Sequence, residues 1–317
     1  MKTIVWFRGK DLRVADHAPL RQAMKAGEVI PLFVVDPYFF APERARQLPH
    51  RMQFLLDSLV ALSQSIAERG SRLVVVEGRS VDVVPELARR WAVDRVVAHR
   101  WVEPFGRRRD TEIASALGPA FELHEGELLN PPGVLRSGSG RPYAVFTPFA
   151  RAFARDVAVG RPLPAPRRLP PLPKIAAEEI DIPSLRALGL ERNPRVLEGG
   201  ETAGRRRLDR FVRRAAVDYH RERDRMDHAG TSRLSADLKF GTVSPRQAWA
   251  AVTKAHGDAP GAAAFRNELV WREFSYGSLW DRPEAPVVVV LEFGVSGQIC
   301  EHSIARRLER WMGSQAC

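Results

Sequence analysis

Polar side chains that can bind a phosphate gather in the stretch GTSRLSADLKFG. Thr231, Ser232 and Ser235 carry hydroxyl groups, and Arg233 carries a guanidinium. We expect Thr231 and Ser232 to cap a helix that Gly241 ends. Hydroxyls, free backbone N–H groups and a guanidinium at one helix start suit a phosphate or pyrophosphate. Two ordinary alternatives stay open: plain helix capping, and an ion pair of Arg233 with a carboxylate on another helix.

A second chemically capable group lies in the stretch FRNELVWREF, residues 265–274. Glu268, Trp271 and Arg272 stand at i, i+3 and i+4, so a helix places them on one face. An indole can stack on a nucleic-acid base and a carboxyl group can hydrogen-bond it, which suits the floor of a base-binding cavity. The ordinary alternative is a surface ion pair of Glu268 with Arg272 beside a partly buried Trp.

Helical patterns surround these two groups. A helix pattern begins at Glu201, and its apolar stripe comprises Leu208, Phe211, Val212, Ala215, Ala216 and Tyr219. Its basic residues include Arg205, Arg206, Arg210, Arg213 and Arg214. A helix face that carries such basic residues is usually only solvated, although it can also contact phosphates. Ser244-Pro245-Arg246-Gln247 matches a capping box with proline at the first helical position.

The first 130 residues alternate between strand and helix patterns. Runs rich in β-branched residues at 2–7, 29–36, 71–78, 94–100 and 121–129 predict strands. Stretches between them, such as residues 50–70, have apolar residues at helical spacing. This alternation predicts a doubly wound parallel sheet, whose ligands bind at the carboxyl ends of the strands.

The sequence predicts that the chain is organised in four consecutive segments. Residues 1–130 form the α/β domain, 131–200 the connection, 201–284 a helical domain, and 285–317 an aberrant tail. Within the connection, the proline-rich run 161–173 can form neither helix nor inner strand, which predicts a semi-rigid linker.

Composition narrows the class of protein. The chain has 317 residues, and 49 Lys and Arg against 38 Asp and Glu give a net charge of +11. This favours a polyanionic partner such as nucleic acid, although a GC-rich genome also enriches arginine. The two cysteines, Cys300 and Cys317, offer neither a disulfide framework nor metal-site spacing. We find no signal-peptide or membrane-span pattern, so a cytoplasmic protein is expected.

Four segments in order resemble the photolyase/cryptochrome family, DNA photolyases in particular. They are VWFRGKDLRVADHAPL, GRPYAVFTPFARAF, GTSRLSADLKFGTVSPRQAW and NELVWREF. The resemblance covers about residues 1–284. It implies an N-terminal α/β domain with an antenna chromophore in some members, followed by an all-helical FAD-binding domain, here incomplete.

The resemblance also implies residue roles. FAD would be contacted by Tyr219, Thr231, Ser232, Arg233, Leu234, Ser235, Phe265, Glu268 and Arg272. Glu268 and Trp271 would act on a flipped pyrimidine dimer, and Arg223 would contact DNA. The implied activity is that of a deoxyribodipyrimidine photolyase: blue light drives an electron from reduced FAD into a cyclobutane dimer in UV-damaged DNA. The protein is expected to be a monomer.

Two alternatives to repair stay open: a cryptochrome-like light sensor and an inactive remnant. Sensors often lose the polar–aromatic pair that holds the dimer, so Glu268 and Trp271 favour repair. Phe105-Gly106 stands where folate-binding relatives tend to have Asn-Glu, so we do not assign folate as the antenna chromophore.

After Glu284 the sequence no longer resembles the family. Family members usually continue much further and carry more of the flavin pocket there. We expect a frameshift near Glu284, with a genuine short tail as the alternative.

Overall fold

The computed structural model describes residues 1–176, 178–225 and 227–283. Contacts divide the chain into two compact units. The first comprises Met1–Trp101, Phe105–Leu129 and Val159–Arg266. The second comprises Val102–Pro104, Asn130–Ala158 and, among the described residues, 267–283. The four ranges expected from the sequence stay a prediction, and the expected aberrant tail with both cysteines lies outside the described residues.

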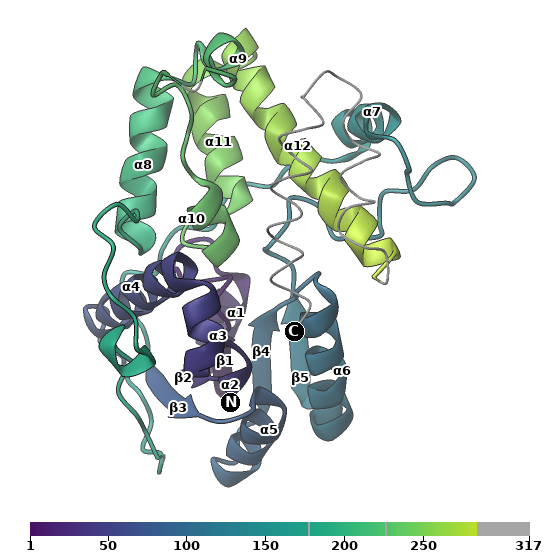
Figure 1. The fold of residues 1–317 in the computed structure, drawn as a ribbon. Coiled ribbons are helices and arrows are strands. Elements are labelled where there is room, and N and C mark those ends of the chain that lie inside the picture. The colour runs from purple at the N-terminus through teal and green to yellow at the C-terminus, as the bar shows by residue number, and fades with distance from the viewer. Residues whose placement is uncertain (177, 226, 284–317) are drawn as a thin grey trace. The chain divides into compact units, whose positions relative to one another are not determined.

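The first unit is built on a parallel sheet with strand order β3-β2-β1-β4-β5 (Figure 1). The strands are β1 (Lys2–Phe7), β2 (Glu28–Val35), β3 (Val74–Glu77), β4 (Arg95–His99) and β5 (Phe121–His124). All the predicted strands are present, and β5 ends earlier than the pattern suggested. The strand order reverses beside β1, so the carboxyl ends of β1 and β4 flank the usual ligand crevice of such sheets.

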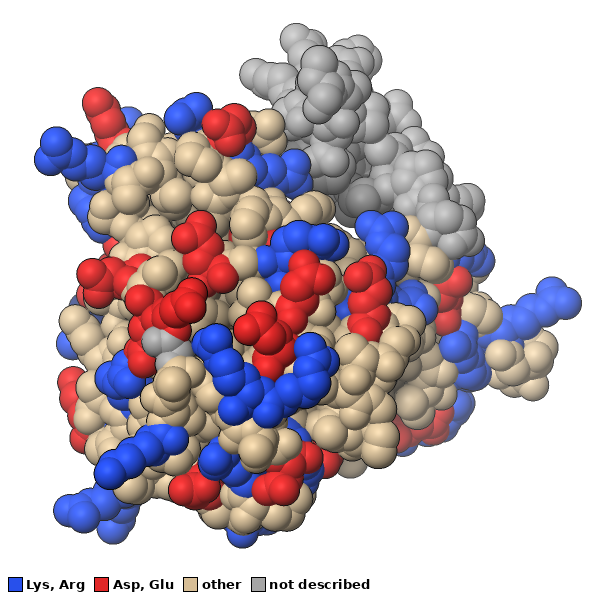
Figure 2. Space-filling model, turned by 90° about the horizontal axis from the view of Figure 1, so that it is seen from below, with Lys and Arg blue, Asp and Glu red and all other residues tan. Residues whose placement is uncertain are grey.

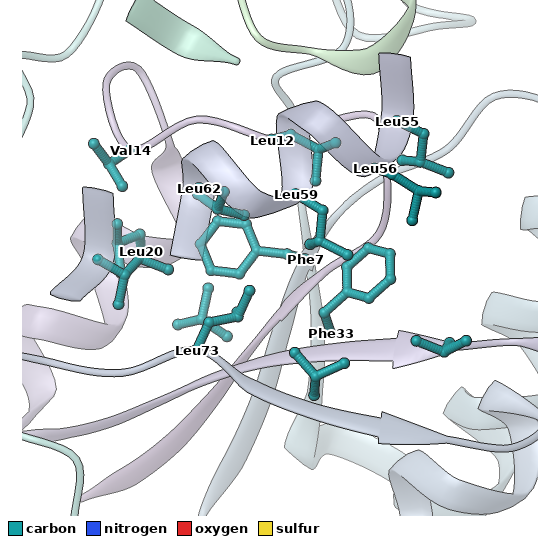
Figure 3. Packing of buried hydrophobic residues seen from close by; sticks show 14 of the residues in the cluster. Phe7, Leu12, Val14, Leu20, Phe33, Leu55, Leu56, Leu59, Leu62 and Leu73 are labelled. Atoms are coloured by element: carbon teal, nitrogen blue, oxygen red, sulfur yellow. The ribbon is translucent and has the colours of Figure 1, made fainter. Parts of the chain in front are cut away.

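Alternate strand residues face opposite sides of the sheet. Figure 3 shows one face, where Phe7, Phe33 and Leu73 pack against Leu20 of α1 (Ala18–Ala26) and against Leu55, Leu56, Leu59 and Leu62 of α4 (Pro49–Ala67). On the other face, Ile4, Trp6, Leu32 and Val96 pack with Leu87 of α5 (Ser80–Arg90) and Ile113 of α6 (Pro104–Leu117). The predicted doubly wound α/β fold is confirmed.

Short elements join the sheet to the rest of the chain. Helices α2 (Pro37–Phe40) and α3 (Pro42–Gln47) follow β2, and 3-10 turns cover Gly118–Ala120 and Arg186–Leu188. The later helices are α7 (Phe146–Asp156), α8 (Glu201–Arg214), α9 (Tyr219–Glu222), α10 (Ser235–Phe240), α11 (Pro245–His256) and α12 (Pro260–Asp281). No helix of the described chain is long and apolar enough to cross a membrane.

The apolar stripe predicted from Leu208 to Tyr219 does not lie on a single helix. The N–H groups of Ala215 and Ala216 both donate to the Phe211 carbonyl, at 2.9 and 3.0 Å. Helix α8 therefore closes at this point, and Tyr219 begins α9. Leu208 and Phe211 are buried as expected.

The proline-rich run 161–173 is neither helix nor strand, as predicted, but it is fixed to the first unit. The Asp16 N–H donates to the Leu163 carbonyl at 2.8 Å, and the Leu163 N–H donates to Asp16 Oδ1 at 3.0 Å. The Leu169 N–H donates to the Arg69 carbonyl at 2.8 Å, and the Leu169 side chain is buried. The segment is a packed strap within this unit.

Candidate functional site

The candidate phosphate site lies just before α10 in the first unit. The helix starts at Ser235 and has Leu234 at its N-cap position, so the expectation that Thr231 and Ser232 cap it is wrong. Arg233 interrupts that helix start, because its φ of 54° is left-handed. This conformation costs an L-residue about 1–2 kcal/mol. Strain of this kind concentrates at ligand sites.

The polar side chains of this turn point away from the protein core. Thr231, Arg233 and Ser235 are exposed, and Ser232 is half-buried. Ser232 Oγ accepts a 3.4 Å hydrogen bond from the Leu234 N–H, and Leu234 itself is buried. Hydroxyls and a guanidinium therefore surround a turn anchored by one leucine, which is the donor set that a pyrophosphate needs.

The end of α10 is locked to the loop after β1. Gly241, the predicted stop, has φ of 65° and ends the helix as expected. A Cβ there would lie 1.8 Å from the Lys10 carbonyl oxygen, which only glycine avoids. The Gly241 carbonyl accepts from Arg13 Nη1 at 2.8 Å, and the Leu12 N–H donates to the Phe240 carbonyl at 3.2 Å. The loop GKDLR thus positions the turn that carries Arg233.

A buried carboxylate ties α10 to α8. Asp237 is fully buried and accepts two hydrogen bonds from Arg207, 2.7 and 2.8 Å long. Thr242 Oγ1 donates to the same carboxylate at 2.7 Å. Sequence reasoning overlooked this pair, although an Asp in the first turn of a helix and an Arg on the preceding helix are the signal that could have found it.

Tyr219 and Phe265, two of the predicted flavin contacts, lie in an aromatic cluster of the first unit. Their ring centroids are 5.5 Å apart, and each ring also contacts Phe211. Phe265 is buried and Tyr219 is half-buried. Arg223 follows in the next turn, is exposed, and has an ion-pair contact of 3.5 Å with Asp224.

Glu268, Trp271 and Arg272 lie on α12 in the second unit and are all half-buried. Trp271 stacks on Phe146, with ring centroids 3.5 Å apart and planes 8° apart. The Arg272 guanidinium lies 4.5 Å from the Tyr276 ring centroid and 3.7 Å from Glu273 Oε1. Glu268 and Trp271 stand three residues apart on this helix, so the predicted acid and indole lie on one face of it.

An unpredicted cluster of ionisable groups sits behind the loop GKDLR. Asp11, His17 and His99 are fully or almost fully buried, and the ligand atoms of all three lie within 4.8 Å of one another. Asp11 Oδ2 is 3.3 Å from His99 Nδ1 and 3.6 Å from His17 Nε2. This geometry resembles a two-histidine, one-carboxylate metal site.

The hydrogen bonding of His17 argues against a metal there. His17 Nδ1 accepts from the Leu20 N–H at 3.1 Å, so the ring proton lies on Nε2. A metal at Nε2 would require an imidazolate. Burial lowers the pKa of both histidines. Burial alone would raise the pKa of Asp11, but its hydrogen bonds to the two histidines hold that pKa well below its usual value. We interpret the cluster as structural.

The carboxyl ends of β1 and β4 carry cations packed on indoles. The Arg109 guanidinium lies 4.7 Å from the Trp6 ring and 4.5 Å from the Trp101 ring. Burial, with the Arg8 charge nearby, lowers the pKa of Arg109 to about 9. Both indoles and both guanidinium groups are less than a tenth exposed. The protein's own side chains occupy this edge of the sheet.

Phe105-Gly106 belongs to the same region. Phe105 stacks on Tyr38, with centroids 3.9 Å and planes 12° apart. A Cβ at Gly106 would lie 2.6 Å from Trp101 Cβ, so a larger residue does not fit there.

Comparison with known proteins identifies the family. The family model described as DNA photolyase matches residues 3–168, which is over half of the chain. The chain belongs to the DNA photolyase family. A deoxyribodipyrimidine photo-lyase of Thermus thermophilus is 38% identical over 88% of this chain and 61% of its own length. The family and fold predictions are confirmed.

Solved structures of photolyases and cryptochromes support this family assignment. A class III photolyase from Agrobacterium tumefaciens is 33% identical with a TM-score of 0.78, covering 89% of this chain and 60% of that one. A Synechocystis cryptochrome is 27% identical with a TM-score of 0.79, and the match covers 88% of this chain and 61% of that one. The chain spans about six tenths of the length of the curated photo-lyases it matches.

Proposed function

We propose that this protein is a deoxyribodipyrimidine photolyase-type flavoprotein that repairs UV-damaged DNA. The observation that supports repair most directly is the pairing of Glu268 with Trp271, an acid and a stacked indole one turn apart on α12. A pyrimidine dimer taken out of the duplex needs an aromatic surface to stack on and a polar group to hydrogen-bond its base edges.

The turn before α10 fits the pyrophosphate of FAD. Thr231, Ser232 and Ser235 would donate from their hydroxyls and Arg233 from its guanidinium, while Leu234 anchors the turn. Tyr219, Phe265, Glu268 and Arg272 would contact other parts of the cofactor. When bound and reduced, FAD supplies the light-driven electron that splits the dimer.

The protein's own residues bind and orient the DNA. Arg223, which is exposed, would contact a phosphate and keep the damaged strand in register. Trp271 would hold the extruded dimer by stacking. Glu268 would hydrogen-bond the base edges of the dimer and help to hold it against Trp271.

A light sensor is the second candidate, because cryptochromes are among the similar proteins. Retention of both Glu268 and Trp271 favours repair. The two functions differ in one measurable reaction, the loss of cyclobutane dimers under blue light.

The test follows dimer loss from an oligonucleotide under blue light and in the dark, with FAD content measured by absorbance after heat release. Glu268→Ala should lower the repair yield roughly tenfold or more, the worth of one hydrogen bond to a charged group. Glu268→Gln keeps a polar group that can hydrogen-bond the base edge and should lose less. Light-independent binding with no repair by the flavin-loaded chain would contradict the proposal and favour a sensor.

A further inference from the structure

Phe146 is the first residue of α7, and its ring covers one face of the Trp271 indole. The centroids are 3.5 Å apart and the planes 8° apart, so the two rings overlap face to face. Aromatic pairs more often adopt offset or edge-to-face geometry. Nothing in the spacing of Phe146 along the sequence relates it to α12.

The Phe146 ring is itself held by the core of the second unit. Phe274 meets it edge-on at 5.9 Å and 73°, and Phe274 also meets Trp271 at 5.9 Å and 80°. Phe274 is buried and packs against the buried Phe149 at 5.3 Å. The stack is therefore attached to a fixed aromatic cluster, while Phe146 and Trp271 stay half-buried.

This arrangement occupies one stacking face of the indole. An indole has two stacking faces, and Phe146 takes one of them. Phe274 at the edge of both rings restricts their rotation. A base that binds Trp271 must then stack on the remaining face, next to a ring that has already lost its rotamer freedom. Fixing a side chain before binding avoids the entropic cost of ordering it when the ligand binds.

We propose that Phe146 is a positioning residue for damaged DNA: it fixes the Trp271 indole so that an extruded pyrimidine dimer becomes the third layer of a Phe–Trp–base stack. The inference rests on the proposed function, because it assumes that Trp271 receives the dimer. Phe146 acts through Trp271 and does not touch the DNA.

The test measures binding in the dark to a duplex with one cyclobutane dimer and to the same duplex undamaged. Phe146→Leu keeps an apolar side chain but removes the flat ring. It should weaken binding of the damaged duplex roughly three- to tenfold, the worth of one aromatic pair. Binding of undamaged duplex and FAD content should stay within about twofold. Phe146→Tyr restores a stacking ring and should restore the preference for damage.

Tyr143→Leu is the matched control. Tyr143 lies three residues before Phe146 and contacts Phe149 at 5.9 Å, in the same aromatic cluster. Its replacement should leave the preference for damage unchanged. Near-UV circular dichroism and thermal unfolding confirm that each variant folds.

Trp271→Ala separates the proposed role of Phe146 from the proposed function of the protein. If Trp271→Ala abolishes the preference for damage and Phe146→Leu does not change it, the role of Phe146 is overturned and the proposed function stands. If the wild-type chain itself does not distinguish damaged from undamaged duplex, the proposed function fails and the inference fails with it.

Discussion

His17 performs two tasks with one ring. Its Nδ1 caps α1 by accepting from the Leu20 N–H, and its Nε2 lies 3.6 Å from Asp11 Oδ2. Asp11 Oδ1 in turn accepts from the Arg8 N–H at 2.8 Å. The two imidazoles beside Asp11 thus shape the loop that supports α10. This explains in physical terms why a motif near the N-terminus matters to a site more than 200 residues later.

The buried histidines make stability depend on pH. Burial lowers the pKa of His17 and of His99 below the ordinary 6.5. Below pH 6.5 the unfolded chain therefore binds more protons than the folded chain, and the free energy of unfolding falls as the pH falls. We expect a slope of up to about 1.4 kcal/mol per pH unit for each histidine, measured by urea unfolding between pH 8 and pH 5.

His17→Asn tests the origin of that slope. Asparagine can still accept from the Leu20 N–H as an N-cap residue, but it does not titrate. The variant should keep most of its stability at pH 8 and lose about half of the slope between pH 6.5 and pH 5. An unchanged slope would mean that other groups control acid unfolding.

At the scale of elements, periodicity predicted more than local capping did. Strand patterns located β1 to β5, and the Ser244–Gln247 box caps α11 through reciprocal bonds of 3.0 and 2.8 Å. The start of α10 was misplaced because a left-handed Arg233 stops the helix, and propensity rules do not foresee such a residue. The Phe146–Trp271 stack joins residues 125 positions apart, which no local pattern can reveal.

Asp16 connects three segments of the first unit. Its carboxylate accepts from the Ser244 hydroxyl, from Arg246 Nε at 3.1 Å and from the Leu163 N–H at 3.0 Å. The residue is fully buried and has a left-handed φ of 51°. The loop after β1, the proline-rich strap and the start of α11 therefore depend on one carboxylate.

Asp16→Ala should cost about 3–5 kcal/mol, because it leaves the partly buried Arg246 without its carboxylate. Asp16→Asn should cost less, since asparagine tolerates a left-handed φ and keeps an acceptor. Asp57→Ala is the control, because it removes an ion pair with the exposed Arg192 and should cost at most about 1 kcal/mol. Urea unfolding gives the free energy of unfolding of each of the three variants. Equal losses of stability in Asp16→Ala and Asp57→Ala would refute the special role of Asp16.

At the scale of the whole molecule, positive charge is in excess but not uniform. The chain has a net charge of +11, yet Figure 2 shows basic and acidic side chains interspersed on the face it presents. On α8, in contrast, the exposed arginines are Arg205, Arg206, Arg210, Arg213 and Arg214, and none pairs with a carboxylate within the described residues. Composition predicted a polyanionic partner but could not show where the excess charge is exposed.

We expect α8 to supply phosphate contacts that do not depend on damage. Arg206, Arg210, Arg213 and Arg214 fall on one side of the helix, since their spacing follows the i, i+4, i+7 and i+8 pattern. Each duplex phosphate that a cation neutralises contributes about 0.9 to the slope of log affinity against log salt. Replacing the four arginines by glutamine should weaken binding of undamaged duplex and reduce that slope by about 2–4. The ratio of damaged to undamaged affinity should not change, because phosphate contacts carry no information about the base.

Glutamine at Arg186 and Arg195, two exposed arginines outside α8, gives the control, with the change in slope compared per arginine removed. A salt slope that falls by the same amount per arginine removed in both variants would show that the charge acts only through its total. A lost preference for damage would place α8 in the lesion site.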